Sequence, residues 1–325
     1  MNLKDGGALP IDFDASDLCE ELISFSRHVR QSPNAQACKI VAGICRHLDS
    51  VAKKAAQFIA VSIDNSPHYL EPEYHNVSHY LDVGVTALAF ALEEKKHSSD
   101  FLAQKGMALS REDISDCFIA GLIHDLGHPG GGNSKDVPFE LELNSWNLAE
   151  PLLIKAGYKG KRLARLKTML LSTDPAHGVP VIEKAMGAHS TLQETTGFLP
   201  HAHLSGLRDI KTAVMSYMLA KADISFSLML ETYLDRVSDL HNEHAAKQTG
   251  MKFLDENGVP IKSGAVFFFE KIAGVTPENK FMLRSVENII GQSAQMTLRA
   301  VLNGHIVPEQ PKRKFRLVAA RHFRT

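Results

Sequence analysis

The sequence has few of the features that mark a membrane, secreted or disulfide-built protein. It has four cysteines in 325 residues, and none of them shows the paired close spacing of a zinc knuckle. All four lie in apolar helical patterns, so we expect buried, reduced thiols and a reducing compartment. No uninterrupted apolar run approaches the roughly 18 residues of a membrane span. Residues 1–17 are polar and acidic, without the apolar stretch of a signal peptide. We therefore expect a cytoplasmic protein with no membrane partner. The cysteines are Cys19, Cys38, Cys45 and Cys117.

A charge excess of either sign is also missing. The formal net charge is −1, from 36 basic and 37 acidic residues. Such a chain has no general attraction to nucleic acid or to an anionic membrane, so we expect neither as a main partner. Hydrophobic residues make up 44% and charged residues 22%, which is ordinary for a globular protein long enough to bury a sizeable core.

Internal repeats and sustained strand alternation are absent as well, whereas apolar residues recur at three- and four-residue steps along most of the chain. We predict an all-α protein. It would have a flexible lead-in over residues 1–15, one helical domain over 16–305 and a basic tail over 306–325. The predicted helices start near residue 16, cover 35–63 (as one or two), run from about 75 to 96 and begin again at the capping-box-like Ser110–Asp113. Further helices cover 140–156, 160–172, 178–188, 207–246 (one long or two abutting) and 277–302.

Two short windows hold most of the side chains capable of chemistry. Residues 74–82 read YHNVSHYLD, and residues 121–133 read GLIHDLGHPGGGN. Imidazole and carboxylate are common metal ligands. His75 and His79 are four residues apart and so share one face of a helix. A single histidine of this kind is more often a capping or core residue, but two such clusters favour a metal site.

A further acid, Asp223, lies in a predicted helix among apolar neighbours, where it is costly unless it is paired or metal-bound. A His-Asp step with a distant histidine and a distant aspartate can close a mixed-ligand site, and one carboxylate can bridge to a second ion about 3.5–4 Å away. Two ions would activate a bridging hydroxide and clamp a phosphoryl group. A histidine near the ions but not bound to them can protonate the leaving alkoxide. The place of His75 between Tyr74 and Asn76, at the start of the helix, favours His75 as that donor and His79 as a ligand.

The two windows resemble the class I cyclic nucleotide phosphodiesterases, a branch of the HD-domain metallohydrolases. The family pattern Tyr-His-Asn-x-x-His-x-x-Asp-Val is met by residues 74–83, and His-Asp-x-x-His-Pro-Gly-x-x-Asn is met by residues 124–133. The likeness continues more thinly to about residue 270. It implies an all-α catalytic domain of the HD type that hydrolyses 3′,5′-cyclic nucleotides, cAMP or cGMP or both, to 5′-nucleoside monophosphates.

The resemblance also implies roles for individual residues. The tighter metal, Zn²⁺, would be held by His79, His124, Asp125 and Asp223. Asp125 would bridge to a second ion, Mg²⁺ or Mn²⁺, with the nucleophilic hydroxide between the two, and His75 would protonate the O3′ leaving group. The residues implied around the second ion and the substrate are Tyr74, His128, Asn133, Glu142, Thr173 and Asp174. For Glu142 the match is incomplete, because the family's neighbouring histidines are missing.

The departures from the family concern the nucleoside end of the substrate. Phe226 stands where the family has Asn, and Gly264 stands where it has the Gln that grips the purine. Phe267 or Phe268 would supply the aromatic wall. A site without that amide loses a hydrogen-bond discriminator worth a few kcal/mol. The alternatives are therefore an HD-type hydrolase of another phosphoester, or a non-enzymatic nucleotide-binding relict. Whether the chain forms a homodimer stays open.

Overall fold

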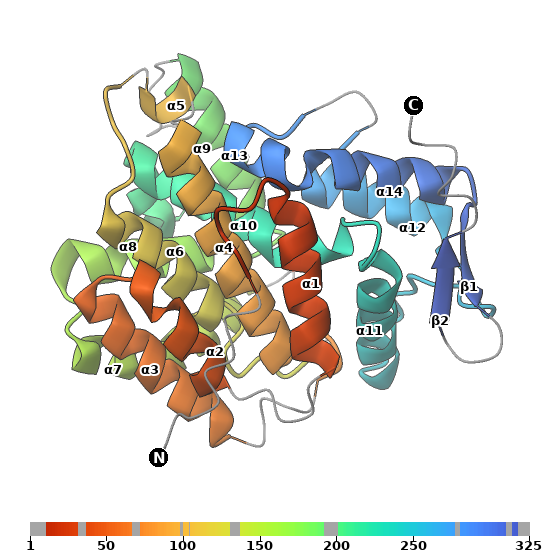
Figure 1. Ribbon diagram of the computed structural model, residues 1–325, viewed down its shortest axis with the longest axis horizontal. Coiled ribbons are helices and arrows are strands. Elements are labelled where there is room, and N and C mark those ends of the chain that lie inside the picture. Colours follow the sequence, from red (N-terminus) through yellow and green to blue (C-terminus); the bar gives the residue numbers. More distant parts are fainter. Residues whose placement is uncertain are drawn as a thin grey trace.

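The computed structural model describes residues 11–31, 37–66, 72–97, 100–103, 105–130, 137–191, 201–276, 280–309 and 314–317. Helices make up nearly all of its regular structure, which confirms the predicted all-α fold (Figure 1). Within these ranges the strands are β1 (Ile306–Glu309) and β2 (Lys314–Leu317), an antiparallel pair that falls in the region expected to be a tail. Residues 1–10 of the predicted lead-in lie outside the described part.

The first half of the chain follows the predicted pattern closely. The apolar pattern over 35–63 forms two helices rather than one, because the chain turns at Cys45–His47 and Asp49 then starts a new helix by accepting the N–H groups of Val51 and Ala52. Ser110 and Asp113 form the expected capping box. The helices are α1 (Leu18–Gln31), α2 (Ala37–Ile44), α3 (Ser50–Asp64), α4 (Val77–His97), α5 (Asp100–Ala103) and α6 (Arg111–Ile123).

The second half adds a series of helices, several of them short or irregular. They are α7 (Glu140–Ala156), α8 (Gly160–Leu171), α9 (Val179–Thr191), the 3₁₀ segment Ala202–Arg208, α10 (Ile210–Ile224) and α11 (Tyr233–Ala246). After these come α12 (Lys262–Phe267), which runs on as a π-helix over Phe268–Ala273, then α13 (Arg284–Val286), a π turn over Glu287–Gly291, and α14 (Gln292–Leu302).

Over 207–246 the structure has two helices, the second of the predicted alternatives, although residues 225–232 separate them. Hydroxyl groups satisfy backbone carbonyls in that break: Ser225 donates to the carbonyl of Lys221 and Thr232 to that of Phe226. Asp223 therefore lies in the last turn of α10, not in the middle of a long helix. The terminal helix begins at Arg284 rather than at 277.

Helices α4, α6 and α10 form the centre of the bundle (Figure 1). Nearly every residue of α4 between His79 and Ala91 is buried. Gly84 of α4 and Gly121 of α6 meet where these helices cross, and a Cβ on Gly121 would lie 2.6 Å from the Cα of Gly84. No side chain fits in that space. The close crossing brings the N-terminal turn of α4 near the C-terminal end of α6.

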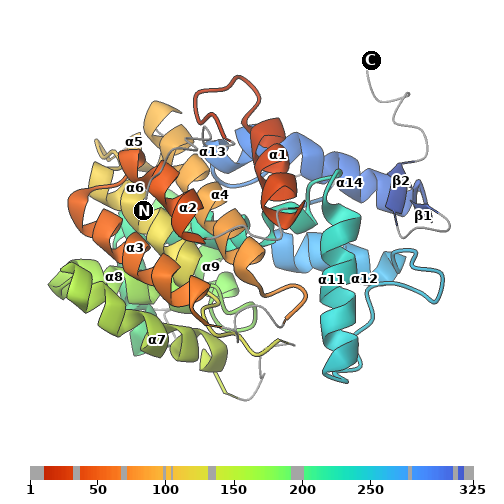
Figure 2. The same ribbon diagram turned by 60° about the horizontal axis from the view of Figure 1, so that its bottom comes forward.

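The remaining helices cover this centre. Helix α1 packs on α4, α3 packs on α6 and α7, and α8 and α9 pack on α10. Helix α11 stands at one side, between the bundle and the part of the chain that holds α12, α14 and the strands (Figures 1 and 2). No described helix is both long enough and apolar enough to cross a membrane. The four cysteines are free; Cys117 is buried, and the other three are half-buried rather than buried as expected.

A buried ionic network joins the outer helices to α6. Asp116 is fully buried and accepts hydrogen bonds from Arg162 and Arg165 of α8. Arg162 also reaches Asp49 at the start of α3, and Arg165 reaches Asp113. Because every charge in the network has a partner, we interpret it as structural: it anchors the N-terminal half of α6, and His124 follows the other end of that helix.

Candidate metal centre

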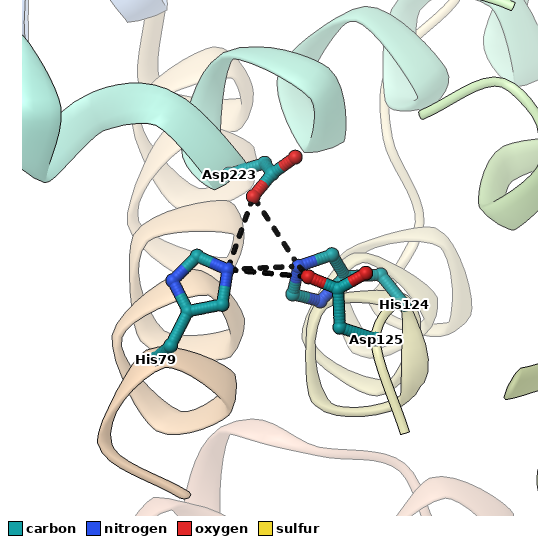
Figure 3. Close-up of side chains that lie close together, drawn as sticks. All are labelled: His79, His124, Asp125 and Asp223. Atoms are coloured by element: carbon teal, nitrogen blue, oxygen red, sulfur yellow. Dashed lines mark hydrogen bonds and ion pairs between the residues drawn. The ribbon is translucent and has the colours of Figure 1, made fainter. Parts of the chain in front are cut away.

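Four predicted residues from three remote segments converge on one point: His79 at the start of α4, His124 and Asp125 after α6, and Asp223 at the end of α10 (Figure 3). The Nε2 atom of His124 lies 3.2 Å from Nε2 of His79, 3.0 Å from Oδ2 of Asp125 and 3.3 Å from Oδ1 of Asp223. The Nε2 atom of His79 lies 3.4 Å from Oδ2 of Asp125 and 3.2 Å from Oδ1 of Asp223.

These spacings fit a shared metal ion. Ligands about 2.0–2.2 Å from one ion lie roughly 3.0–3.5 Å from each other. Nδ1 of His124 donates to the carbonyl of Gly121 over 2.8 Å, so its Nε2 carries the lone pair that faces the centre. Two imidazole nitrogens and two carboxylate oxygens suit zinc or a similar ion. The residues present therefore fit a metal.

Local structure positions the two histidines of this group, His79 and His124. The side-chain oxygen of Asn76 accepts the N–H groups of Ser78 and His79 and the hydroxyl of Ser78, which caps α4 and sets the first turn that carries His79. The carbonyl that holds His124 belongs to Gly121, the residue that lets α4 and α6 approach closely.

The electrostatics of the centre favour positive charge. Burial by itself lowers the pKa of His124, but Asp125 and Asp223 outweigh it and raise that pKa well above its usual value. Burial raises the pKa of Asp125, yet His124 and His75 bring it well below its usual value, and the pKa of Asp223 is likewise lowered by His124 and His79. A field that stabilises protons on buried imidazoles also stabilises a divalent cation in their place.

His75 lies next to this group and is oriented by a residue that sequence reasoning missed. Oε1 of Glu243, on α11, accepts Nδ1–H of His75 over 2.6 Å, while its Oε2 accepts the backbone N–H groups of Tyr74 and His75. Nε2 of His75 is thereby turned to within 3.7 Å of Oδ2 of Asp125. Burial lowers the pKa of His75, but Asp125 and Glu243 outweigh it and the pKa ends above its usual value.

Two more predicted residues pack around His75. His128 is buried and stacks on the His75 ring, with 3.8 Å between ring centroids. Burial and the neighbouring His75 lower the pKa of His128 to about 4. Tyr74 is buried, contacts the rings of His75 and His79, and shares a hydrogen bond with the hydroxyl of Ser227. The donor atoms of His75, His128 and Glu243 lie within 4.8 Å of one another, so this second group could also hold an ion.

Neither acid predicted near the second ion, Asp174 or Glu142, belongs to the two groups whose donor atoms converge in the described ranges. Thr173 and Asp174 are buried in the turn after α8, where Asp174 accepts the backbone N–H groups of Phe139, Ala176 and His177. Glu142 is buried in the first turn of α7, outside the two groups whose donor atoms converge in the described ranges. Asn133 lies outside the described residues.

The predicted aromatic wall is only partly at a cavity. Phe268 and Gly264 line a small cavity of about 10 Å³ together with Tyr233 and Phe253, whereas Phe267 is 58% exposed. Phe226 is buried under the guanidinium of Arg236. A Cβ on Gly264 would meet only the carbonyl oxygen of Lys252, at 3.7 Å, so a side chain would fit there.

Neither a family model nor a curated protein matches this chain. Among solved structures, LmjPDEB1 in complex with IBMX matches with a TM-score of 0.58 and 18% identity, over 94% of this chain and 92% of that one. The phosphodiesterase domain of the RhoPDE fusion protein from the choanoflagellate Salpingoeca rosetta has a TM-score of 0.48 and 18% identity, with 91% of each chain covered. The match to LmjPDEB1 shows that the chain has the fold of a phosphodiesterase catalytic domain.

Proposed function

We propose that this chain is a metal-dependent phosphodiesterase that hydrolyses 3′,5′-cyclic nucleotides to 5′-nucleoside monophosphates. One observation carries the proposal: His79, His124, Asp125 and Asp223 converge from three remote segments, and Glu243 holds His75 beside them with Nε2 3.7 Å from Asp125. The fold shared with LmjPDEB1 supports it.

The four converging residues would hold the tighter ion, for which Zn²⁺ suits two imidazoles and two carboxylates. Asp125 lies 3.7 Å from Nε2 of His75, on the side of the ring opposite Glu243, and it would also reach the second ion, Mg²⁺ or Mn²⁺. When bound, such ions lower the pKa of coordinated water and neutralise charge on the phosphoryl oxygens.

His75 would act as the general acid. The bond between phosphorus and O3′ breaks as hydroxide adds its oxygen to phosphorus, and the departing alkoxide takes the proton from Nε2 of His75. Glu243 keeps Nδ1–H engaged and stabilises the imidazolium before transfer, so Nε2 is the atom left to give up its proton.

The nucleoside would lie toward Phe268 and Gly264. LmjPDEB1 binds IBMX, a small molecule, which supports a small-molecule site in this fold. With glycine at position 264, no amide reads the edge of the base there, so we expect weak discrimination between cAMP and cGMP.

Two residues favour a different phosphoester as substrate. Gly264 offers no amide to a base, and Phe226, which stands where the family has Asn, is buried under Arg236. The same metal chemistry would then act on a phosphodiester without a purine. A nucleotide-binding relict is the non-enzymatic alternative, and it would require protein that takes up no metal.

A panel of substrates with metal add-back tests these readings. Purified protein, stripped with chelator and reloaded with Zn²⁺ and Mg²⁺ or Mn²⁺, is given four 3′,5′-cyclic nucleotides, bis(p-nitrophenyl) phosphate and simple phosphomonoesters. We expect turnover of the cyclic nucleotides, abolished by Asp125→Ala and retained by Asp235→Ala, whose aspartate is exposed on α11. Turnover of bis(p-nitrophenyl) phosphate but of no cyclic nucleotide would favour the alternative that the natural substrate is a different phosphoester. Fully loaded protein inert toward every substrate would overturn the proposal.

A further inference from the structure

We propose that His128 is a positioning residue for the proton donor: its ring, stacked on His75, keeps Nε2 of His75 aimed at the metal centre. The inference rests on the proposed function, because it assigns His128 a task relative to His75 as general acid. It concerns how the donor is held, and it predicts a loss of activity that depends on the leaving group.

The contacts of His75 show what each neighbour fixes. The hydrogen bond to Glu243 holds one atom, Nδ1, at 2.6 Å. This single hydrogen bond fixes the position of Nδ1 but does not by itself fix the tilt of the His75 ring plane about the line from Nδ1 to Oε1 of Glu243. The face of His128 removes that freedom, because its ring lies 3.8 Å away at an interplanar angle of 18°. The Tyr74 ring packs edge-on against the His75 ring, at an interplanar angle of 72°, and restricts its movement in a second direction. Glu243 thus fixes the position of Nδ1, and the rings of His128 and Tyr74 fix the plane of the His75 ring.

His128 is itself rigidly held. It is 5% exposed, and its Nδ1 accepts the backbone N–H of Gly130 at 3.0 Å. Gly130 has a φ of +82°, and a Cβ there would lie 3.2 Å from Cγ of Glu243 and 3.3 Å from Cε of Lys247. The loop that carries His128 is therefore pressed against α11, the helix that supplies Glu243. The two residues that orient His75, Glu243 and His128, therefore both depend on the position of α11.

The stacked geometry argues against a metal ion held jointly by His75 and His128. An ion lies in the plane of each imidazole that binds it, so two ligating rings must point at one place. Rings that face each other at 18° have nearly parallel planes and cannot do so without turning apart. The 2.6 Å contact between Nδ1 and Oε1 is also the distance of a charge-assisted hydrogen bond. The geometry of His75, His128 and Glu243 therefore suits a proton shared between His75 and Glu243 better than a bound metal ion.

The dependence of the rate on the leaving group distinguishes a residue that positions the proton donor from a residue that supports the metal ions. Departure of O3′ from a cyclic nucleotide needs a proton, whereas p-nitrophenolate leaves bis(p-nitrophenyl) phosphate without one. Loss of a positioning residue should therefore slow only the first reaction. Loss of a group that supports the metals should slow both.

The variants are His128→Ala, which removes the ring, and His128→Phe, which keeps an aromatic face. His28→Ala, a change at an exposed histidine of α1, is the control. We expect His128→Ala to lower kcat for the cyclic nucleotide by about ten- to a hundredfold, with KM and bound metal retained and less than about a threefold loss on the nitrophenyl diester. His128→Phe should recover most of the lost kcat.

Equal losses on both substrates, a fall in metal content with His128→Ala, or a folded His128→Phe protein as slow as the alanine variant would each overturn the inference. A second readout needs no turnover: NMR of the imidazole resonances should show His75 losing the ring-current shift of His128 and gaining ring motion in His128→Ala. A wild-type protein inactive on all phosphodiesters would refute the proposed function alone, while unchanged His75 resonances would refute the role of His128.

Discussion

At the scale of single residues, the centre separates the side chains that would hold an ion from the one that would move a proton. The Nε2 atoms of His79 and His124 face two carboxylates at 3.0–3.4 Å. His75 faces the same place but is turned by a carboxylate of its own, Glu243. The two kinds of histidine therefore differ in their partners, and His75 is also half-buried where His79 and His124 are buried.

This difference predicts that Asp125→Ala loses its bound metal, whereas His75→Ala keeps it. Asp125→Ala removes an oxygen from the middle of the group, so metal and turnover should be lost together, with kcat falling by about a thousandfold or more. His75→Ala removes only the donor, so kcat on cyclic nucleotides should fall by about 10²–10⁴-fold while the metal stays. Metal analysis beside steady-state kinetics measures both. Equal metal loss in the two variants would contradict the division of roles.

The pH dependence of kcat should show the effect of Glu243. His75 must be protonated to donate, so kcat should hold below its pKa and fall as pH rises through it. Glu243 raises that pKa. Glu243→Gln removes the charge, lowers the pKa and should move the alkaline limb to lower pH. Glu73→Gln, at an exposed glutamate two residues before His75, should leave the limb in place. A limb that does not move in Glu243→Gln would mean that another group controls it.

At the scale of elements, the crossing of α4 and α6 decides whether the ligands meet. Gly121 and Gly84 allow the two backbones to touch, and His124 follows Gly121 by less than one turn. Any side chain at Gly121 must push α6 away from α4, and His124 would move with it.

A matched pair of glycine variants tests this crossing. Gly121→Ala should destabilise the fold by about 1–3 kcal/mol through overpacking and should weaken metal binding as well. Gly187→Ala, in α9, places a Cβ with no atom within 4 Å, so it should be neutral or stabilise by about 0.5–1 kcal/mol and leave metal affinity unchanged. Chemical unfolding and metal titration measure the two effects. Normal metal affinity in a folded Gly121→Ala protein would show that the crossing does not position the ligands.

Helix α11 reaches the centre through buried polar contacts. Arg236 is fully buried and pairs with Asp82 of α4 and with Ser26 of α1. Burial and the nearby Arg30 lower the pKa of Arg236 to about 10. Two turns further along α11, Glu243 binds the segment just before α4. A helix at the side of the bundle (Figure 2) thus orients the ring of His75.

At the scale of the whole molecule, the four candidate ligands come from three parts of the chain that lie up to 144 positions apart (79 to 223). A bound ion cross-links α4, α6 and α10 only in the folded state, and so should stabilise it by mass action.

Removing the metal should therefore lower stability measurably. At a free metal concentration a hundred times the Kd, binding adds about 2.7 kcal/mol to the free energy of unfolding. Urea unfolding of wild-type protein with Zn²⁺ and with chelator should differ by an amount of this order. Asp125→Ala should show no such difference. Identical curves for loaded and stripped wild-type protein would indicate that no ion is bound by the folded centre.

The sequence alone determined what depends on local pattern. Helical periodicity is local, so the fold class and most helices could be predicted, as could the capping box at Ser110 and the two windows that hold His75, His79, His124 and Asp125. The sequence left open whether 207–246 forms one helix or two, because the hydroxyl-to-carbonyl bonds at Ser225 and Thr232 that accompany the break carry no proline or glycine signal.

Only the tertiary structure decided what depends on contact between distant segments. Glu243 lies 168 residues from His75, and nothing in its own helix marks it as more than one acid among several. The stack of His128 on His75 and the exposure of Phe267 rather than Phe268 are likewise set by packing. The physical reason is that a sequence pattern shows which face of a helix is buried, whereas the orientation of one ring depends on which other helix lies against it.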